Sequence, residues 1–133
     1  MQAIHEIPTF HQNSEGFLNY LRGSDDASKS LSPERFSEVF SVDFQTLAAQ
    51  AHVHRNTISR APTSAGVQRY LREAVRVIYA AIDISGDVER AIFWYRNAPI
   101  APFDYKTAEE LVSEGRTEDL IRYIQSLEAG ALG

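Results

Sequence analysis

Residues 43–60 read DFQTLAAQAHVHRNTISR, and this stretch decides the fold class. Apolar and small side chains recur here at three- and four-residue spacings, which is the pattern of an amphipathic helix. Asp43 is a favoured N-cap residue, so the pattern predicts a helix over Phe44–Ala51. A tight turn at 52–55 then leads to a second, short helix at 56–60. The positions expected to face inward are Leu47, Ala48, Ala51, Val53 and Ile58.

The same periodicity runs through most of the remaining chain. We expect further helices over residues 14–21, 33–40, 63–84, 87–96, 107–112 and 118–127. The residues expected to cap or open them are Ser14, Ser32 with Pro33, Thr63, Asp87, Thr107 with Glu110 at capping-box spacing, and Thr117. Residues 1–13 are expected to form an irregular arm, 23–32 a polar loop and 97–105 an ordered turn. Eight helices without a convincing strand predict an all-α fold.

Composition and charge limit the class of protein. The 133 residues are 44% hydrophobic and 23% charged, as in ordinary globular proteins, and they include no Cys, which excludes disulfides and thiol chemistry and suits the cytoplasm. No apolar run approaches the roughly 20 residues that span a bilayer, so no membrane partner is expected. The net charge is −5, yet residues 44–103 hold seven Lys and Arg against four Asp and Glu. Because local charge governs phosphate attraction, DNA binding stays open.

The 43–60 stretch has the features of a helix-turn-helix DNA reader. Such a motif needs small residues where its helices cross, a tight turn and a polar-faced second helix. Ala48 and Ala51 would allow the close approach. Arg and Asn can bond base edges, and Ser and Thr can bond phosphates. The candidate DNA-binding residues are His54, Arg55, Asn56, Thr57, Ser59, Arg60 and Arg69.

Both the 43–60 stretch and the arginines of the helix that follows have a plainer interpretation. An ordinary helical hairpin would show much the same pattern, and His52 stands where the turn often carries glycine. Arg69, Arg72 and Arg76 share one face of the predicted long helix. They could follow a phosphate backbone or could simply be solvated.

The last third of the chain carries a more specific pattern. Residues 91–130 read AIFWYRNAPIAPFDYKTAEELVSEGRTEDLIRYIQSLEAG. An aromatic pair with arginine is followed by Asn97, a proline turn, Phe103 with Asp104, a K-T-A-x-E-L-V helix start at 106–112 and a break at Gly115. This order resembles the toxin-binding domain of the Xre/MbcA/ParS antitoxin family. With the Xre-like stretch upstream, the resemblance covers about residues 43–130 and leaves the first forty unassigned.

The resemblance implies a helix-turn-helix region followed by a small helical toxin-binding domain. It also implies a co-encoded protein toxin, commonly of the NAD-consuming RES class, whose cleft is blocked by C-terminal residues. Acidic residues near this C-terminus would suit such a cleft, although solvent exposure explains several of them equally well.

Candidate contact residues for the toxin lie around the proline turn. Aromatic residues and arginine dominate interface hot spots, and a proline-fixed turn lowers the entropy cost of binding. The candidate toxin-binding residues are Tyr95, Arg96, Asn97, Tyr105, Lys106, Glu110 and Arg116. We expect Trp94 and Phe103 to fill the core beneath the turn and Tyr95, Arg96 and Tyr105 to be more exposed.

The sequence offers no enzyme signature. His52 and His54 form H-x-H, which is half a metal site without a third ligand nearby. Nucleophile-elbow, P-loop and dinucleotide-binding motifs are all missing from the sequence. We therefore predict no catalytic residue, metal or cofactor.

The predicted organisation has three parts: residues 1–32 with no assigned role, 33–84 as a helix-turn-helix region with a long connecting helix, and 85–133 as a toxin-binding domain. The expected function is a cytoplasmic antitoxin that neutralises a protein toxin and represses its own operon as a homodimer on operator DNA. Two alternatives stay open. The chain could neutralise a toxin without reading DNA, or it could be a free-standing transcriptional regulator without a toxin.

Overall fold

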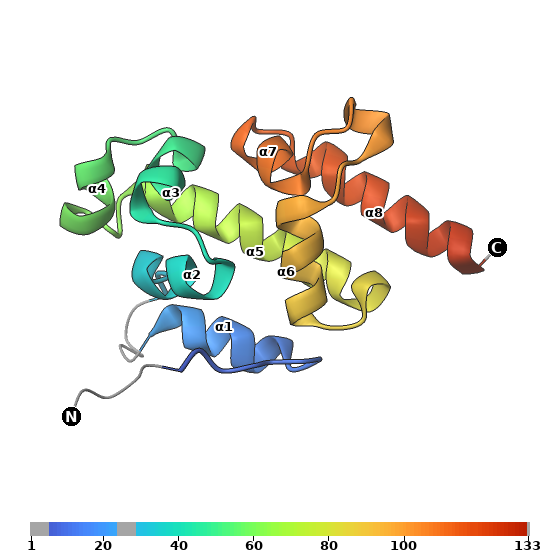
Figure 1. The fold of residues 1–133 in the computed structure, drawn as a ribbon, viewed down its shortest axis with the longest axis horizontal. Helices are drawn as coiled ribbons and strands as arrows, with labels where there is room; N and C mark the ends of the chain where they lie inside the picture. The colour runs from blue at the N-terminus through green and yellow to red at the C-terminus, as the bar shows by residue number, and fades with distance from the viewer. Residues whose placement is uncertain (1–5, 24–28, 133) are drawn as a thin grey trace.

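The structure is a computed structural model that describes residues 6–23 and 29–132. Over these residues the fold is all-α, as predicted (Figure 1). Its elements are α1 (Ser14–Arg22), α2 (Pro33–Phe40), α3 (Phe44–Ala51), α4 (Arg55–Arg60), α5 (Ala65–Ser85), α6 (Val88–Asn97), the 3₁₀ turn η1 (Ala101–Phe103), α7 (Ala108–Ser113) and α8 (Thr117–Leu132). None of the helices in this part of the chain is both long and apolar enough to cross a membrane.

Helix α5 is the axis of the molecule. Its 21 residues span about 31 Å at 1.5 Å per residue. Helices α2, α3, α6, α7 and α8 pack directly on it, while α1 lies against α2 and α4 against α3 (Figure 1). The apolar stripe predicted from the sequence is buried throughout: Val67, Leu71, Val75, Ile78 and Ile82. This stripe gives both halves of the chain a common surface to pack against.

The buried side chains form one continuous core. It includes Phe17 of α1, Leu71 of α5 and Ile124 of α8. Phe36 stacks on Phe40 with ring centroids 3.9 Å apart, and Phe40 meets the edge of another core aromatic on α6. The predicted segments 33–84 and 85–133 therefore share their apolar interior.

Most helix starts follow the expected capping chemistry. Asp43 accepts from the Thr46 N–H at 2.7 Å to begin α3, and Asp87 caps α6 in the same way. Thr107 and Glu110 form the predicted capping box of α7. Each cap satisfies an N–H that has no partner inside its helix, so these starts are fixed locally.

Three predicted caps were wrong. Thr117 is the first residue of α8 and its hydroxyl donates to Glu73 of α5 at 3.3 Å. Asn13, one residue before Ser14, caps α1 by accepting from the Gly16 N–H at 2.9 Å. Helix α5 begins at Ala65 after Ser64, not after Thr63, and has no side-chain cap bond. No side-chain cap therefore marks the start of α5.

The N-terminal arm is irregular over its described residues 6–13, as predicted. Phe10 is buried and anchors the arm in the core. The N–H groups of Phe10 and His11 each donate to the Glu89 carboxylate on α6 at 2.8 Å. Residues 1–5 of the predicted arm and 24–28 of the predicted loop lie outside the described residues.

Candidate functional site

The turn between α3 and α4 adopts the conformation that glycine usually supplies. His52 has φ 58° and ψ 41°, in the left-handed region. Its Nε2 lies 2.7 Å from the Ser113 carbonyl oxygen on α7, and because a carbonyl can only accept, Nε2 carries the donated hydrogen. The Ser113 hydroxyl in turn donates to the Gln50 carbonyl at 2.7 Å. The histidine at this position is therefore compatible with a tight turn and ties it to α7.

Helix α4 presents a polar face to solvent. Ile58 is buried and anchors the helix, while Thr57 is half-buried. His54 Nδ1 accepts from the Asn56 N–H at 3.1 Å, which caps α4 and starts it at Arg55, one residue earlier than predicted. The remaining candidates are all exposed. They are His54, Arg55, Asn56, Ser59 and Arg60 at α4, and Arg69 on α5.

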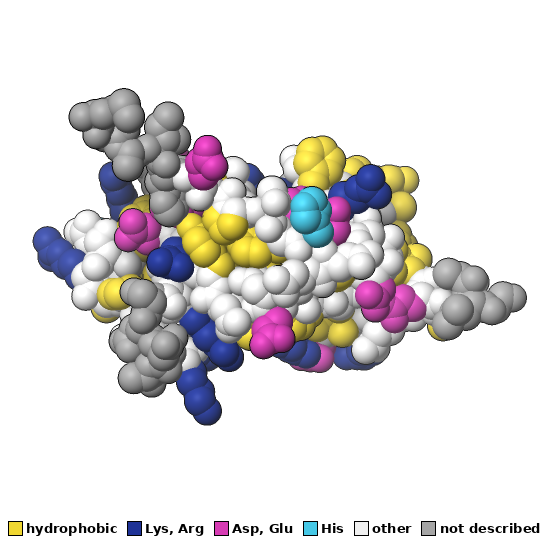
Figure 2. Space-filling view, turned by 90° about the horizontal axis from the view of Figure 1, so that it is seen from below, with side chains coloured by type: hydrophobic (Ala, Val, Ile, Leu, Met, Phe, Trp, Pro, Cys, Tyr) yellow, Lys and Arg dark blue, Asp and Glu magenta, His cyan; other side chains and the backbone are white. Residues whose placement is uncertain are grey.

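The arginines near α4 differ in whether they are paired. No hydrogen bond or ion pair joins the side chains of Arg55, Arg60 or Arg69 to any residue the structure describes. Asp43 has a lowered pKa, chiefly because of the Thr46 N–H bond, with a smaller contribution from the nearby charge of Arg55. Arg76, in contrast, pairs with Glu118 of α8 at 2.8 Å. Figure 2 shows Lys and Arg side chains at the end of the molecule where Figure 1 places α4.

Tyr95 does not lie on the surface, contrary to the prediction. Its side chain is fully buried and its hydroxyl lies 2.9 Å from that of Tyr70. The buried face of α6 carries Val88, Ala91, Ile92 and Tyr95. These positions follow the i, i+3, i+4, i+7 spacing of one helix face, and Tyr95 is the last of them.

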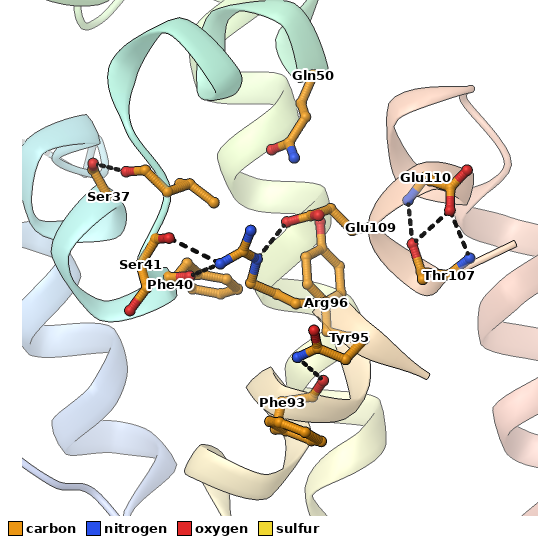
Figure 3. Close-up of polar contacts among 12 residues, drawn as sticks. Ser37, Phe40, Ser41, Gln50, Phe93, Tyr95, Arg96, Thr107, Glu109 and Glu110 are labelled. Carbon is orange, nitrogen blue, oxygen red and sulfur yellow. Dashed lines mark hydrogen bonds and ion pairs between the residues drawn. The ribbon is translucent and has the colours of Figure 1, made fainter. Parts of the chain in front are cut away.

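Arg96 is bound within the fold (Figure 3). Its Nε donates to Glu109 at 3.0 Å, and its Nη1 donates to the carbonyls of Phe40 and Ser41 at 2.8 and 2.9 Å. These carbonyls end α2, so the guanidinium satisfies acceptors that lack a partner inside that helix. Arg96 thus joins α2, α6 and α7, and its charge is already compensated.

The other predicted toxin contacts near the proline turn each have a partner within the chain. Glu110 closes the capping box with Thr107 (Figure 3), Lys106 pairs with Glu114 at 2.6 Å, and the Arg116 guanidinium lies 5.0 Å from the Phe103 ring centroid. Asn97 is exposed and donates to the Phe93 carbonyl at 3.0 Å. Several acidic groups of this region are thus paired within the chain.

Tyr105 is strongly exposed, as predicted. Its side chain is 70% exposed, and both Asp104 and Tyr105 have positive φ, 57° and 63°. Two successive left-handed residues make a tight turn, which the Ile100–Lys106 bridge closes. A bulky residue in this conformation is strained, and such strain is concentrated at functional sites.

An apolar groove lies between α5, α6 and α8 and was not predicted. It has a volume of about 290 Å³ and is lined by Ala81, Ile84, Ser85, Arg90, Trp94, Ile124 and Leu127. Ile84 and Leu127 are 45% and 39% exposed. Trp94, expected in the core, is half-buried and lines the groove. The signal in the sequence that could have indicated this groove is the position of Ile84 and Leu127 at the ends of the apolar stripes of two helices.

One group of potential metal ligands converges in the part of the chain that is described: His11, Asp87 and Glu89. It comes from the N-terminal arm and the start of α6. The H-x-H pair of His52 and His54 is not part of it, because His52 Nε2 faces Ser113 and His54 Nδ1 caps α4.

Comparison with known proteins returned no match to a protein-family model, to a curated protein or to a solved structure. The functional assignment therefore depends on the residues and their arrangement.

Proposed function

We propose that this chain is an antitoxin that binds operator DNA through α4 and a protein toxin through its C-terminal helices. The observation that carries the proposal is the separation of two surfaces along α5. The polar, arginine-bearing face of α4 lies near its N-terminal end, and the apolar groove lies at its C-terminal end.

Helix α4 has the side chains and size for reading DNA. Six residues give a helix of about 9 Å, which fits a major groove roughly 12 Å wide. In a helix-turn-helix the first residues of the reading helix contact the bases, and here these are Arg55 and Asn56. Arg60 and Arg69 are the candidates for phosphate contacts.

One short helix offers few contacts, so we expect two copies of the chain to bind one operator. Regulators of this kind place two reading helices about 34 Å apart, in successive major grooves of a two-fold operator. A homodimer would also double the number of phosphate contacts that the chain's exposed arginines can make.

The apolar groove supports the toxin-binding half of the proposal. Trp94 and Arg90 belong to the residue types that dominate interface hot spots. Ile84 and Leu127 add exposed apolar area, and Tyr105 presents a rigid aromatic ring on the same C-terminal third. A RES-type toxin is the partner that the family resemblance implies.

The DNA-binding half is tested by gel retardation with the region upstream of the gene. Arg55→Ala with Arg60→Ala should abolish retardation and leave toxin capture intact. Arg122→Ala removes an exposed arginine of α8 and is the matched control, which should bind DNA like the parent chain. Undiminished DNA binding by the double variant would refute α4 as the reading helix.

The toxin-binding half is tested by co-purification with the tagged product of the adjacent gene. Ile84→Asp with Leu127→Asp should abolish capture, because each places a charge in the apolar groove. Ile7→Asp is the matched control, since Ile7 is also 45% exposed but lies on the N-terminal arm. Capture without DNA binding would indicate a neutraliser alone, and DNA binding without capture would indicate a free-standing regulator.

A further inference from the structure

The N-terminal arm brings one imidazole and two carboxylates together at the start of α6. The ligand atoms of His11, Asp87 and Glu89 all lie within 4.8 Å of one another. The imidazole is exposed and both carboxylates are half-buried, so the cluster is open to solvent. A mixture of nitrogen and carboxylate oxygen donors suits Zn²⁺ and related divalent transition-metal ions.

Backbone hydrogen bonds hold these side chains in place. The two oxygens of Glu89 accept from the N–H groups of Phe10 and His11, each at 2.8 Å. Oδ1 of Asp87 accepts from the Arg90 N–H at 2.8 Å. The Val88 N–H donates to the His11 carbonyl at 2.7 Å, which fixes the arm against α6. A carboxylate oxygen has two lone pairs, so each can accept an N–H and still bind a cation.

The local charge favours a cation. Asp87 and Glu89 together carry −2, which exceeds the roughly +0.5 of the helix N-terminus. Arg90 follows directly, but its side chain forms no ion pair with either carboxylate. The carboxylates are thus not neutralised by a side chain of the described part of the protein.

We propose that His11, Asp87 and Glu89 bind one divalent transition-metal ion, with water in the remaining coordination positions. The ion would join two segments that are 78 residues apart in sequence, His11 and Glu89, and would hold the arm on α6. Because the arm and α6 are brought together by folding, the ion binds the folded state and raises its stability. The proposal does not depend on the antitoxin assignment.

The test is calorimetric titration of the full, untagged chain with ZnCl₂, together with its melting temperature with and without Zn²⁺. His11→Ala removes the imidazole but keeps the backbone N–H that Glu89 binds. Asp87→Asn removes the charge but keeps an oxygen that can cap α6. The parent chain should bind one equivalent and melt higher with Zn²⁺, and each variant should bind at least tenfold more weakly.

His54→Asn is the matched control, because it removes an exposed histidine outside the cluster and retains a capping side chain. It should bind Zn²⁺ like the parent chain. The proposal is overturned if the parent chain shows no saturable binding, if His11→Ala and Asp87→Asn bind as tightly as the parent, or if only His54→Asn loses the ion. Circular dichroism of the metal-free variants checks that all of them fold.

Discussion

The hydroxyl groups of Tyr70 and Tyr95 lie 2.9 Å apart inside the core, where α5 packs on α6. Tyr70 donates its hydrogen to Gln50 Oε1 of α3 at 2.9 Å, so the Tyr95 hydroxyl must donate to the Tyr70 oxygen. This short chain of hydrogen bonds connects α3, α5 and α6. It links the helix pair that carries the candidate DNA-reading face to the C-terminal helices.

The direction of these bonds predicts unequal costs for two similar substitutions. Tyr70→Phe leaves the buried Tyr95 hydroxyl without its acceptor and should lower the free energy of unfolding by about 1–3 kcal/mol. Tyr95→Phe leaves Tyr70 bonded to Gln50 and should cost about 0.5–1.5 kcal/mol. Urea unfolding of the two variants measures the difference. A larger loss for Tyr95→Phe would contradict the assigned donor.

Stability should fall in alkaline solution because of the same pair. Burial raises the pKa of both Tyr70 and Tyr95 above the ordinary value of about 10. Because the pKa is raised in the folded state, the contribution of these two hydroxyls to the free energy of unfolding is complete below about pH 10. Above about pH 10 this contribution is lost, because the same hydroxyls ionise in the unfolded chain. Tyr95→Phe should reduce the slope of stability against pH by up to about 1.4 kcal/mol per pH unit above pH 10. An unchanged slope in urea unfolding would contradict the burial of an ionisable hydroxyl.

We expect Arg96 to contribute to the stability of the fold rather than to toxin binding. Arg96→Ala leaves Glu109 and two carbonyls at the end of α2 without their donor, and we expect a loss of about 2–3 kcal/mol. Arg90→Ala, a change to an exposed arginine on the same helix, should stay within about 0.5 kcal/mol. Thermal or urea unfolding compares the two. Equal, small losses would mean that the Arg96 bonds contribute little to the fold.

Arg69 and Arg76 both lie on α5, but within the described residues only Arg76 is paired with a carboxylate. Their substitution should therefore change the salt dependence of DNA binding differently. Arg69 is unpaired, so Arg69→Ala should weaken binding to all sequences alike and lower the salt slope by about one. Arg76 is held by Glu118, so Arg76→Ala should leave the slope unchanged. Retardation assays at several salt concentrations measure both slopes. The reverse result would place the phosphate path further along α5.

Local chemistry made much of the fold predictable. Asp43 and Asp87 start α3 and α6 because a side-chain oxygen and its N–H partner are three residues apart, a distance that sequence alone contains. The α5 stripe was predictable for the same reason, since 3.6-residue periodicity marks the buried face. The exposed face of α4 followed from its single apolar anchor, Ile58.

What sequence could not decide was which of two adjacent aromatics faces inward. Trp94 and Tyr95 are neighbours on α6 and point about 100° apart, so only the packing of α6 on α5 determines that Tyr95 is buried and Trp94 borders the groove. A tyrosine can occupy the core because Tyr70 satisfies its hydroxyl.

The sequence by itself determined the helical class of this protein and most of its helix starts and buried faces, because those properties depend largely on residues within one or two turns. The tertiary structure alone decided which distant groups meet: His52 with Ser113, Arg96 with the end of α2, and His11 with Glu89. These contacts have no local signal. They exist because a single continuous core fixes the arm and α6–α8 in one arrangement around α5.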